Sequence, residues 1–173
     1  REYVEAQCLE LLEYDPAGIW FDPAVFSTQP GKVGWDPEPF DLPELYETIR
    51  DERPETLISF KDGVTGTEDF VAPELYYDSH GEGLDKPGEV CACMLPSEKY
   101  EDEVRHSWGY LAAAEGKHKT EAEVWDLLRE TRTKGYNLLI NTGPLPDGSL
   151  DPEDTEVLRA VGDRTDSEGM PGN

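Results

Sequence analysis

The sequence is short of basic residues: 15 Lys and Arg stand against 39 Asp and Glu, which gives a formal net charge of −24 at pH 7. Surfaces that bind DNA or RNA need clustered Lys and Arg to displace counterions from phosphate, so a nucleic-acid partner is excluded. An anionic membrane would repel the chain for the same reason. The sequence also lacks an apolar run approaching about 18 residues and lacks the basic-then-apolar start of a signal peptide. We therefore expect a soluble protein with no membrane partner.

Cysteine is scarce as well. The three cysteines, Cys8, Cys91 and Cys93, are too few and odd in number for a disulfide framework. Cys91 and Cys93 lie two residues apart in an apolar run, where a strand would direct both side chains to one face. No second ligand cluster and no suitably spaced His accompanies them, so we interpret them as small buried core residues and not as a zinc site.

Enough apolar residues remain to build a core. Hydrophobic residues make up 36% of the chain and aromatic residues 10%, whereas low hydrophobicity with few aromatics would have indicated disorder. The acidic excess is spread along the chain, which keeps a protein soluble at high salt and leaves a high-salt source open. A length of 173 residues allows one domain or part of a larger one.

Helical and strand-like patterns alternate along the chain. The apolar spacing and capping signals predict helices over residues 2–13, from Asp41 with Glu44 as the capping-box acid, over 120–134, and from Asp151. Short apolar runs predict strands over residues 18–21, 57–60, 70–72, 89–95 and 137–141. This alternation favours an α/β fold with a parallel sheet and crossover connections, arranged like half of a β/α barrel.

Polar residues follow four of these strands: Asp22, Lys61, Glu74 and Asn141. The carboxyl ends of parallel strands meet at one edge of a sheet, and that edge carries the active site in barrels and open α/β sheets.

Asp22 follows two aromatic residues, and local sequence leaves two interpretations open: a catalytic carboxylate, or the start of an Asp-Pro turn. Further carboxylates, including Glu68 and Glu74, occur over residues 66–74, where burial could raise the pKa of a general acid. Paired carboxylates across a barrel mouth suit glycoside hydrolysis.

Several segments, in order, resemble glycoside hydrolase family 29, the α-L-fucosidases. They are Leu11-Leu12 through Tyr14-Asp15-Pro16 to Gly18-Ile19-Trp20-Phe21-Asp22; Leu45-Tyr46 with Ile49-Arg50 and Pro54; Gly66-Thr67-Glu68-Asp69-Phe70 through Pro73-Glu74; Glu89 with Cys91; Ser107-Trp108-Gly109-Tyr110; and Lys134-Gly135 with Asn137-Leu138-Leu139-Ile140-Asn141, Gly143-Pro144 and Asp147-Gly148. The resemblance extends over nearly the whole chain. It implies a retaining exo-glycosidase that removes terminal α-L-fucosyl groups from fucosylated glycans through a covalent glycosyl-enzyme intermediate, with no metal or cofactor.

The resemblance also implies roles for individual residues. Asp22 corresponds to the nucleophile and Glu74 to the general acid/base, with Glu68 as the competitor for that role. Substrate binding falls to Lys61, Trp20 and Trp108. Lys61 stands where many relatives have Arg, so it keeps the charge but loses bidentate geometry. Trp108 resembles an aromatic residue that packs against the apolar side of fucose, and a core Trp under a Gly turn is its alternative.

Three residues depart from the family pattern: Tyr136 replaces a Gly, Gly88 a Trp and Pro23 a Gly. The family's N-terminal segment, which supplies His and aromatic ligands for fucose, has no match in this sequence. We therefore expect residues 1–173 to be the C-terminal half of one catalytic β/α-barrel domain, inactive when isolated.

We interpret the three histidines, His80, His106 and His118, as surface residues. A non-catalytic carbohydrate-binding relative is the alternative function, and an α/β fragment without a site is a third. Localisation, whether secreted, periplasmic or internal, and oligomeric state are left open, as is the preferred fucosyl linkage.

Overall fold

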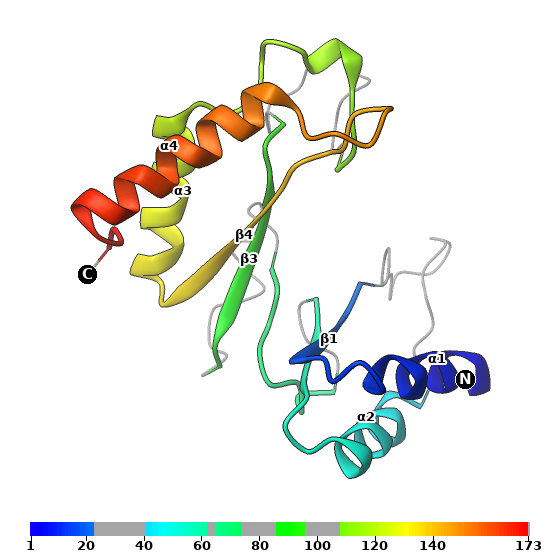
Figure 1. Cartoon of the computed structure of the whole chain (residues 1–173). Helices are drawn as coiled ribbons and strands as arrows, with labels where there is room; N and C mark the ends of the chain where they lie inside the picture. Colours follow the sequence, from blue (N-terminus) through cyan, green and yellow to red (C-terminus); the bar gives the residue numbers. More distant parts are fainter. Residues whose placement is uncertain (23–40, 62–64, 74–85, 96–107, 173) are drawn as a thin grey trace, which may run out of the picture. The chain divides into compact units, whose positions relative to one another are not determined.

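The computed structural model describes residues 1–22, 41–61, 65–73, 86–95 and 108–172 (Figure 1). The chain divides into two compact units. The first unit comprises Arg1–Pro73 and Tyr77–Gly88, and the second comprises Glu74–Tyr76 and Glu89–Asn173.

The first unit contains two helices that alternate with two strands. Its elements are α1 (Glu2–Leu12), β1 (Gly18–Phe21), α2 (Leu42–Glu52) and β2 (Leu57–Phe60). Strands β1 and β2 are parallel, in a register that runs from Gly18 opposite Leu57 to Phe21 opposite Phe60. Parallel bridges from Ser59 to Phe70 and from Val71 to Gly88 continue the pairing beyond β2. The predicted parallel arrangement is confirmed for these segments.

The core of the first unit lies between the two helices and the strand pair. Helix α1 packs against α2. Tyr46 of α2 is fully buried, and its ring centroid lies 5.8 Å from that of Phe21, which in turn stacks on Phe60 at 6.2 Å. The buried members of this cluster are Cys8, Leu12, Leu42, Leu45, Tyr46, Ile49, Ile58 and Phe60. Each aromatic ring therefore buries apolar area close to the ends of β1 and β2.

The start of α2 differs from the prediction. Asp41 is the residue before the first helical turn, as expected, but it has φ of 45° and its side chain makes no capping hydrogen bond. Glu44 instead accepts a 2.6 Å hydrogen bond from the Arg1 guanidinium. The predicted capping box at this helix is wrong, because the nearby Arg1 cation attracts the Glu44 carboxylate away from the helix end.

The second unit repeats the alternation of strand and helix. It contains most of β3 (Gly88–Cys93), followed by the short 3₁₀ helix η2 (Ala112–Ala114), α3 (Glu121–Thr133), β4 (Tyr136–Asn141) and α4 (Pro152–Glu168). Strands β3 and β4 pair, and α3 packs against β4 and α4 (Figure 1). These elements confirm the predicted segments to within a residue or two; β3 ends at Cys93, two residues before the predicted end at Leu95.

Local capping explains where both long helices of the second unit begin. Thr120 accepts a hydrogen bond from the Glu123 amide, and the Glu123 carboxylate accepts one from the Thr120 amide at 2.8 Å, which completes a capping box. These bonds lower the pKa of Glu123 because they favour its ionised form. Asp151 caps α4 by accepting a 2.9 Å hydrogen bond from the Glu153 amide.

The core of the second unit gathers Met94, Val124, Trp125 and Val161. The Arg164 guanidinium covers the Trp125 ring at 4.0 Å. Cys91 is buried, as predicted, whereas Cys93 is half-buried. Among the described residues, no group of His, Cys, Asp and Glu is placed to hold a metal ion. Within the described ranges, no helix is long and apolar enough to cross a membrane.

Candidate active site

Two oppositely charged side chains meet at the carboxyl ends of β1 and β2. Asp22 follows Phe21 and Lys61 follows Phe60, and because Phe21 and Phe60 are opposite each other in the parallel register, the next residues reach the same edge. The Lys61 Nζ atom lies 3.4 Å from Asp22 Oδ1. The Asp22 side chain is 54% exposed and that of Lys61 21%. The structure thus brings together two of the predicted site residues, with the carboxylate accessible to a ligand.

The backbone at Lys61 is strained. Lys61 has φ of 28°, in a region that residues with a side chain rarely occupy. Its carbonyl accepts a hydrogen bond from the Ala72 amide at 2.5 Å, which holds the residue against the following extended segment. Strain of this kind costs about 1–3 kcal/mol and concentrates at functional sites, so it supports a role for Lys61 beyond packing.

Trp20 forms the apolar wall beside this pair. Its ring centroid lies 5.9 Å from Lys61 Nζ, within range of a cation–π contact. Among the described residues, Trp20 Nε1 is the buried side-chain polar atom with no hydrogen-bond partner. A buried N–H without an acceptor is costly.

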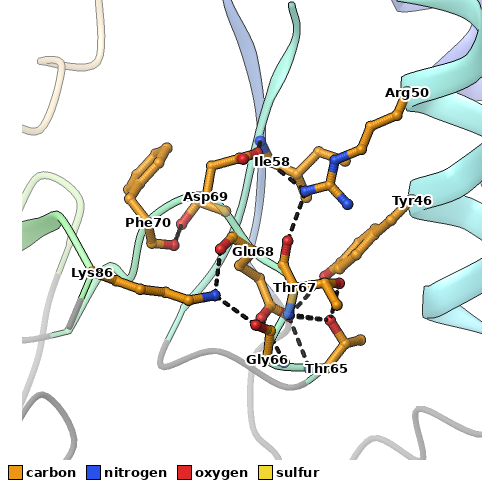
Figure 2. A network of polar contacts seen from close by, with 11 residues as sticks. Tyr46, Arg50, Ile58, Thr65, Gly66, Thr67, Glu68, Asp69, Phe70 and Lys86 are labelled. Carbon is orange, nitrogen blue, oxygen red and sulfur yellow. Dashed lines mark hydrogen bonds and ion pairs between the residues drawn. The ribbon is translucent and has the colours of Figure 1, made fainter. Parts of the chain in front are cut away.

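Glu68, the predicted competitor for the acid/base role, occupies a different environment. It is 2% exposed, and both of its carboxylate oxygens accept hydrogen bonds. Oε1 accepts from the Thr65 amide at 2.9 Å and from the Tyr46 hydroxyl at 3.3 Å, while Oε2 accepts from the Gly66 amide at 3.0 Å. Figure 2 shows Tyr46 of α2 and Glu68 pointing toward one another. A carboxylate so enclosed favours a structural role, because its oxygens are already committed to donors.

Burial changes the pKa of the Tyr46 hydroxyl. Desolvation raises the pKa of Tyr46, and the adjacent Glu68 carboxylate raises it further. The phenol therefore remains protonated and serves Glu68 as a donor over the whole range in which the protein would be studied.

The segment that carries Glu68 is fixed from three other directions (Figure 2). Lys86 Nζ donates to the carbonyls of Gly66 and Glu68, both at 2.6 Å. Arg50 donates to the Thr67 carbonyl at 2.7 Å and contacts Asp69 Oδ2 at 3.2 Å. Asp69 in turn accepts from the Ile58 amide of β2 at 2.7 Å. The network anchors residues 65–69 to β2 and α2, just before the segment that leads to position 74.

Glu74 itself lies outside the described residues, as do His80 and His106. The predicted pairing of Glu74 with Asp22 therefore stays a prediction. Pro73, the last described residue before Glu74, is buried, and the preceding Ala72 is fully buried.

Trp108 and Asn141 belong to the second unit, where they contact each other. Asn141, the last residue of β4, donates from Nδ2 to the Trp108 carbonyl at 2.5 Å. A side chain at Gly143 would place its Cβ 2.5 Å from the Gly109 backbone, so only glycine permits this approach. The Trp108 residue is 40% exposed, which makes the core-Trp alternative wrong.

The interpretation of His118 as a surface residue is wrong. Its side chain is 8% exposed, and Nδ1 lies 2.6 Å from Oδ1 of Asp154, which is 1% exposed. The other Asp154 oxygen accepts a short hydrogen bond from Thr142, just after β4. The pairing joins residues 36 positions apart, so no local spacing reveals it. Asp154 also resembles an ordinary acidic residue in the first turn of a helix.

The chain belongs to the α-L-fucosidase family, because the sequence model of that family matches residues 1–170. Members of this family are glycoside hydrolases. Plasma α-L-fucosidase from Rattus norvegicus is 33% identical over 174 residues, which cover 83% of this chain and 38% of the rat protein. The chain therefore spans about two fifths of the length of this curated relative.

Solved structures of the family have a similar fold. α-L-Fucosidase isoenzyme 1 from Paenibacillus thiaminolyticus matches with a TM-score of 0.69 at 27% identity, over 97% of this chain and 39% of that enzyme. A family 29 α-L-fucosidase from Bacteroides thetaiotaomicron, solved as a trapped covalent intermediate with 2-fluoro-fucosyl fluoride, matches with a TM-score of 0.71 at 19% identity. That match covers 97% of this chain and 39% of the Bacteroides enzyme.

Proposed function

We propose that this chain supplies the nucleophile of a retaining exo-glycosidase that hydrolyses terminal α-L-fucosyl linkages. The observation that carries the proposal is the Asp22 carboxylate at the end of β1, 54% exposed and 3.4 Å from the Lys61 ammonium. An accessible carboxylate held beside a cation is oriented as attack on an anomeric carbon requires. Family membership supports fucose as the sugar.

The reaction proceeds in two displacements. Asp22 attacks the anomeric carbon while a general acid protonates the departing glycosidic oxygen, and the product is a fucosyl ester of Asp22. Water then attacks the ester, the general acid now acts as a base, and the Asp22 carboxylate is regenerated. We assign the acid/base role to Glu74 from the sequence match, since Glu68 is enclosed by hydrogen-bond donors.

The remaining site residues bind substrate in this proposal. Trp20 presents a ring face next to Lys61, which suits the apolar face of a sugar. Trp108 presents a second exposed ring in the other unit. We further propose that both units are parts of one β/α barrel, of which residues 1–173 form the C-terminal half.

A hybrid enzyme tests the proposal. In this hybrid, residues 1–173 replace the corresponding part of the Paenibacillus thiaminolyticus enzyme, and cooperative thermal unfolding verifies its fold before assay. We expect the folded hybrid to hydrolyse an aryl α-L-fucoside, and Asp22→Ala to reduce kcat by about 10³-fold or more. Glu10→Ala, at an exposed position of α1, is the matched control and should leave kcat unchanged. A folded Asp22→Ala hybrid that retains activity would overturn the assignment.

A non-catalytic carbohydrate-binding protein remains the second candidate. The exposed Trp108 ring favours it, because aromatic rings of this kind also serve in binding modules. Titration of the isolated chain with L-fucose, followed by tryptophan fluorescence, separates the two functions. Binding by a chain whose folded hybrid has no turnover would favour the binding module.

A further inference from the structure

The second unit contains an open cavity of about 590 Å³ that the proposed catalytic residues do not line. Its apolar walls come from the Tyr110 ring, Leu145 and two prolines, Pro146 and Pro152. Tyr110 is 44% exposed, so the face of a large aromatic ring is available to a ligand. A volume in the range of about 300–1,000 Å³ is typical of sites for small molecules.

Three segments form the cavity, and each is held in place by its own hydrogen bonds. The loop after β4 closes on itself, with Leu145 and Ser149 joined by a 2.8 Å backbone hydrogen bond. Asp147 accepts from the Ser149 amide at 3.0 Å and from its hydroxyl at 2.6 Å, and these bonds lower the pKa of Asp147. The cavity is therefore formed before any ligand binds, which reduces the entropy lost on binding.

The other two segments, the loop before α3 and the start of α4, are joined by a hydrogen bond. Gly116 donates its amide to Glu153 Oε1 at 2.8 Å, across 37 residues. The Glu153 amide donates its own hydrogen bond to Asp151 Oδ1. Because side chains of the same unit occupy these donors, the start of α4 is not available as an anion site.

The polar groups of the lining are acidic. Glu115, Asp147, Asp151 and Glu153 all contribute to it, and ionised carboxylates accept hydrogen bonds but cannot donate them. An aromatic face combined with acceptors fits a ligand that has an apolar face and many hydroxyl donors, as a pyranose does. The same carboxylates repel sulfated, phosphorylated or uronic sugars.

We propose that this cavity is a binding site for a neutral pyranose, the uncharged part of a glycan to which a fucosyl group is attached. The ring of Tyr110 stacks on the apolar face of the sugar, and the carboxylates of Asp147 and Glu153 accept hydrogen bonds from its hydroxyls. The choice of a glycan as the ligand rests on the proposed function. The existence and lining of the cavity are independent of that function.

The test uses the 173-residue chain labelled with ¹⁵N and three probes: lactose, glucuronate and glucosamine. We expect saturable lactose shifts at Tyr110, Leu145 and Asp147, with a Kd of about 1–10 mM. Glucuronate should bind at least about tenfold more weakly than lactose because of charge repulsion. Tyr110→Ala should weaken lactose binding by about tenfold and Tyr110→Phe by about twofold or less, because Phe keeps the ring.

Tyr14→Ala is the matched control, since Tyr14 is a 78% exposed tyrosine of the first unit. It should leave lactose binding unchanged, and an undisturbed spectrum outside the cavity verifies that Tyr110→Ala is folded. Lactose shifts that are absent, or that saturate at the same lactose concentration in Tyr110→Ala as in the unmodified chain, would overturn the proposal. Tighter binding of glucosamine than of lactose would overturn it too, by identifying a site for organic cations.

The test also separates this proposal from the proposed function. Loss of lactose binding in a chain whose hybrid still depends on Asp22 refutes the sugar cavity alone. Lactose binding in a chain whose folded hybrid lacks turnover refutes the catalytic proposal and keeps the cavity.

Discussion

Lys61 and Asp22 follow directly opposed residues of two parallel strands, and their charged atoms lie 3.4 Å apart. Asp22 is more than half exposed, so the pair contributes little to stability, about 0–1 kcal/mol. The left-handed backbone of Lys61 is unfavourable for folding. A half-exposed ion pair does not account for such strain, whereas the proposed role of Lys61, fixing a cation beside a nucleophilic Asp22, does.

This relationship predicts that substitution of Lys61 separates activity from stability. In the folded hybrid, Lys61→Met should lower kcat by about 10–100-fold, because Asp22 loses the charge that orients it, and KM should change less. The urea midpoint of the isolated chain should change by the equivalent of less than about 1 kcal/mol. Lys61→Arg is the conservative control and should recover most of the lost rate, because the positive charge remains.

A Lys61→Met hybrid with the kcat of the unmodified hybrid would contradict this account. A large loss of stability together with a proportional loss of activity would show that Lys61 is merely structural.

Substitution of Glu68 should lower stability, whereas substitution of Lys61 should lower activity. Glu68→Gln replaces one acceptor oxygen with a donor, which then faces the Thr65 or Gly66 amide. We expect the unfolding free energy of the first unit to fall by about 1–3 kcal/mol, measured by urea denaturation. Glu55→Gln, at an exposed position of the same unit, is the control and should change it by less than about 0.5 kcal/mol. Unchanged stability with a hybrid that loses activity would return Glu68 to the acid/base role.

Tyr46 predicts a specific alkaline response. Burial raises the pKa of its hydroxyl above the value of about 10 that it has in the unfolded chain, so above that pH the folded state binds the additional proton. This contribution to stability is complete below about pH 10 and is lost as the pH rises further, at about 1.4 kcal/mol per pH unit. Averaged between pH 9 and 11, an interval centred on the pKa of the unfolded chain, the unfolding free energy should therefore fall less steeply in Tyr46→Phe, by about 0.7 kcal/mol per pH unit.

Tyr14→Phe is the control for this measurement, because Tyr14 is exposed and should leave the alkaline slope unchanged. Equal slopes for Tyr46→Phe and the unmodified chain would contradict the burial argument.

The buried His118–Asp154 pair predicts the largest loss of stability in the second unit. Asp154→Ala leaves His118 and Thr142 without their shared carboxylate, and we expect a loss of about 3–5 kcal/mol. Asp126→Ala removes an exposed carboxylate whose pair with Arg129 measures 2.9 Å, and it should cost about 0.5 kcal/mol or less. Similar losses for both variants, measured by denaturant unfolding, would show that the buried His118–Asp154 pair stabilises the unit no more than the exposed pair does.

Much of the fold was predictable because its signals are local. The capping box of Thr120 and Glu123, the Asp151 cap and the short apolar strands follow from spacing alone. The edge that joins Asp22 and Lys61 was predictable too, since parallel strands that end on polar residues bring those residues together.

What the sequence did not reveal are pairings over long distances in sequence. His118 and Asp154 are 36 residues apart, and Tyr46 and Glu68 are 22 apart. Glu44 accepts a hydrogen bond from Arg1, 43 residues away in sequence, and does not form the predicted capping box. Only the packed fold determines which distant polar groups meet, so a local pattern could not distinguish the buried carboxylates of Glu68 and Asp154 from the many exposed ones.

The most direct test of the account is to identify the residue that becomes fucosylated. The folded hybrid is incubated with 2-deoxy-2-fluoro-α-L-fucosyl fluoride, which slows hydrolysis of the ester intermediate, and its peptides are mapped by mass spectrometry. We predict one adduct, on the Asp22 carboxylate, and no adduct in Asp22→Asn. An adduct on any other residue, or labelling that survives in Asp22→Asn, would contradict the central claim that Asp22 is the nucleophile.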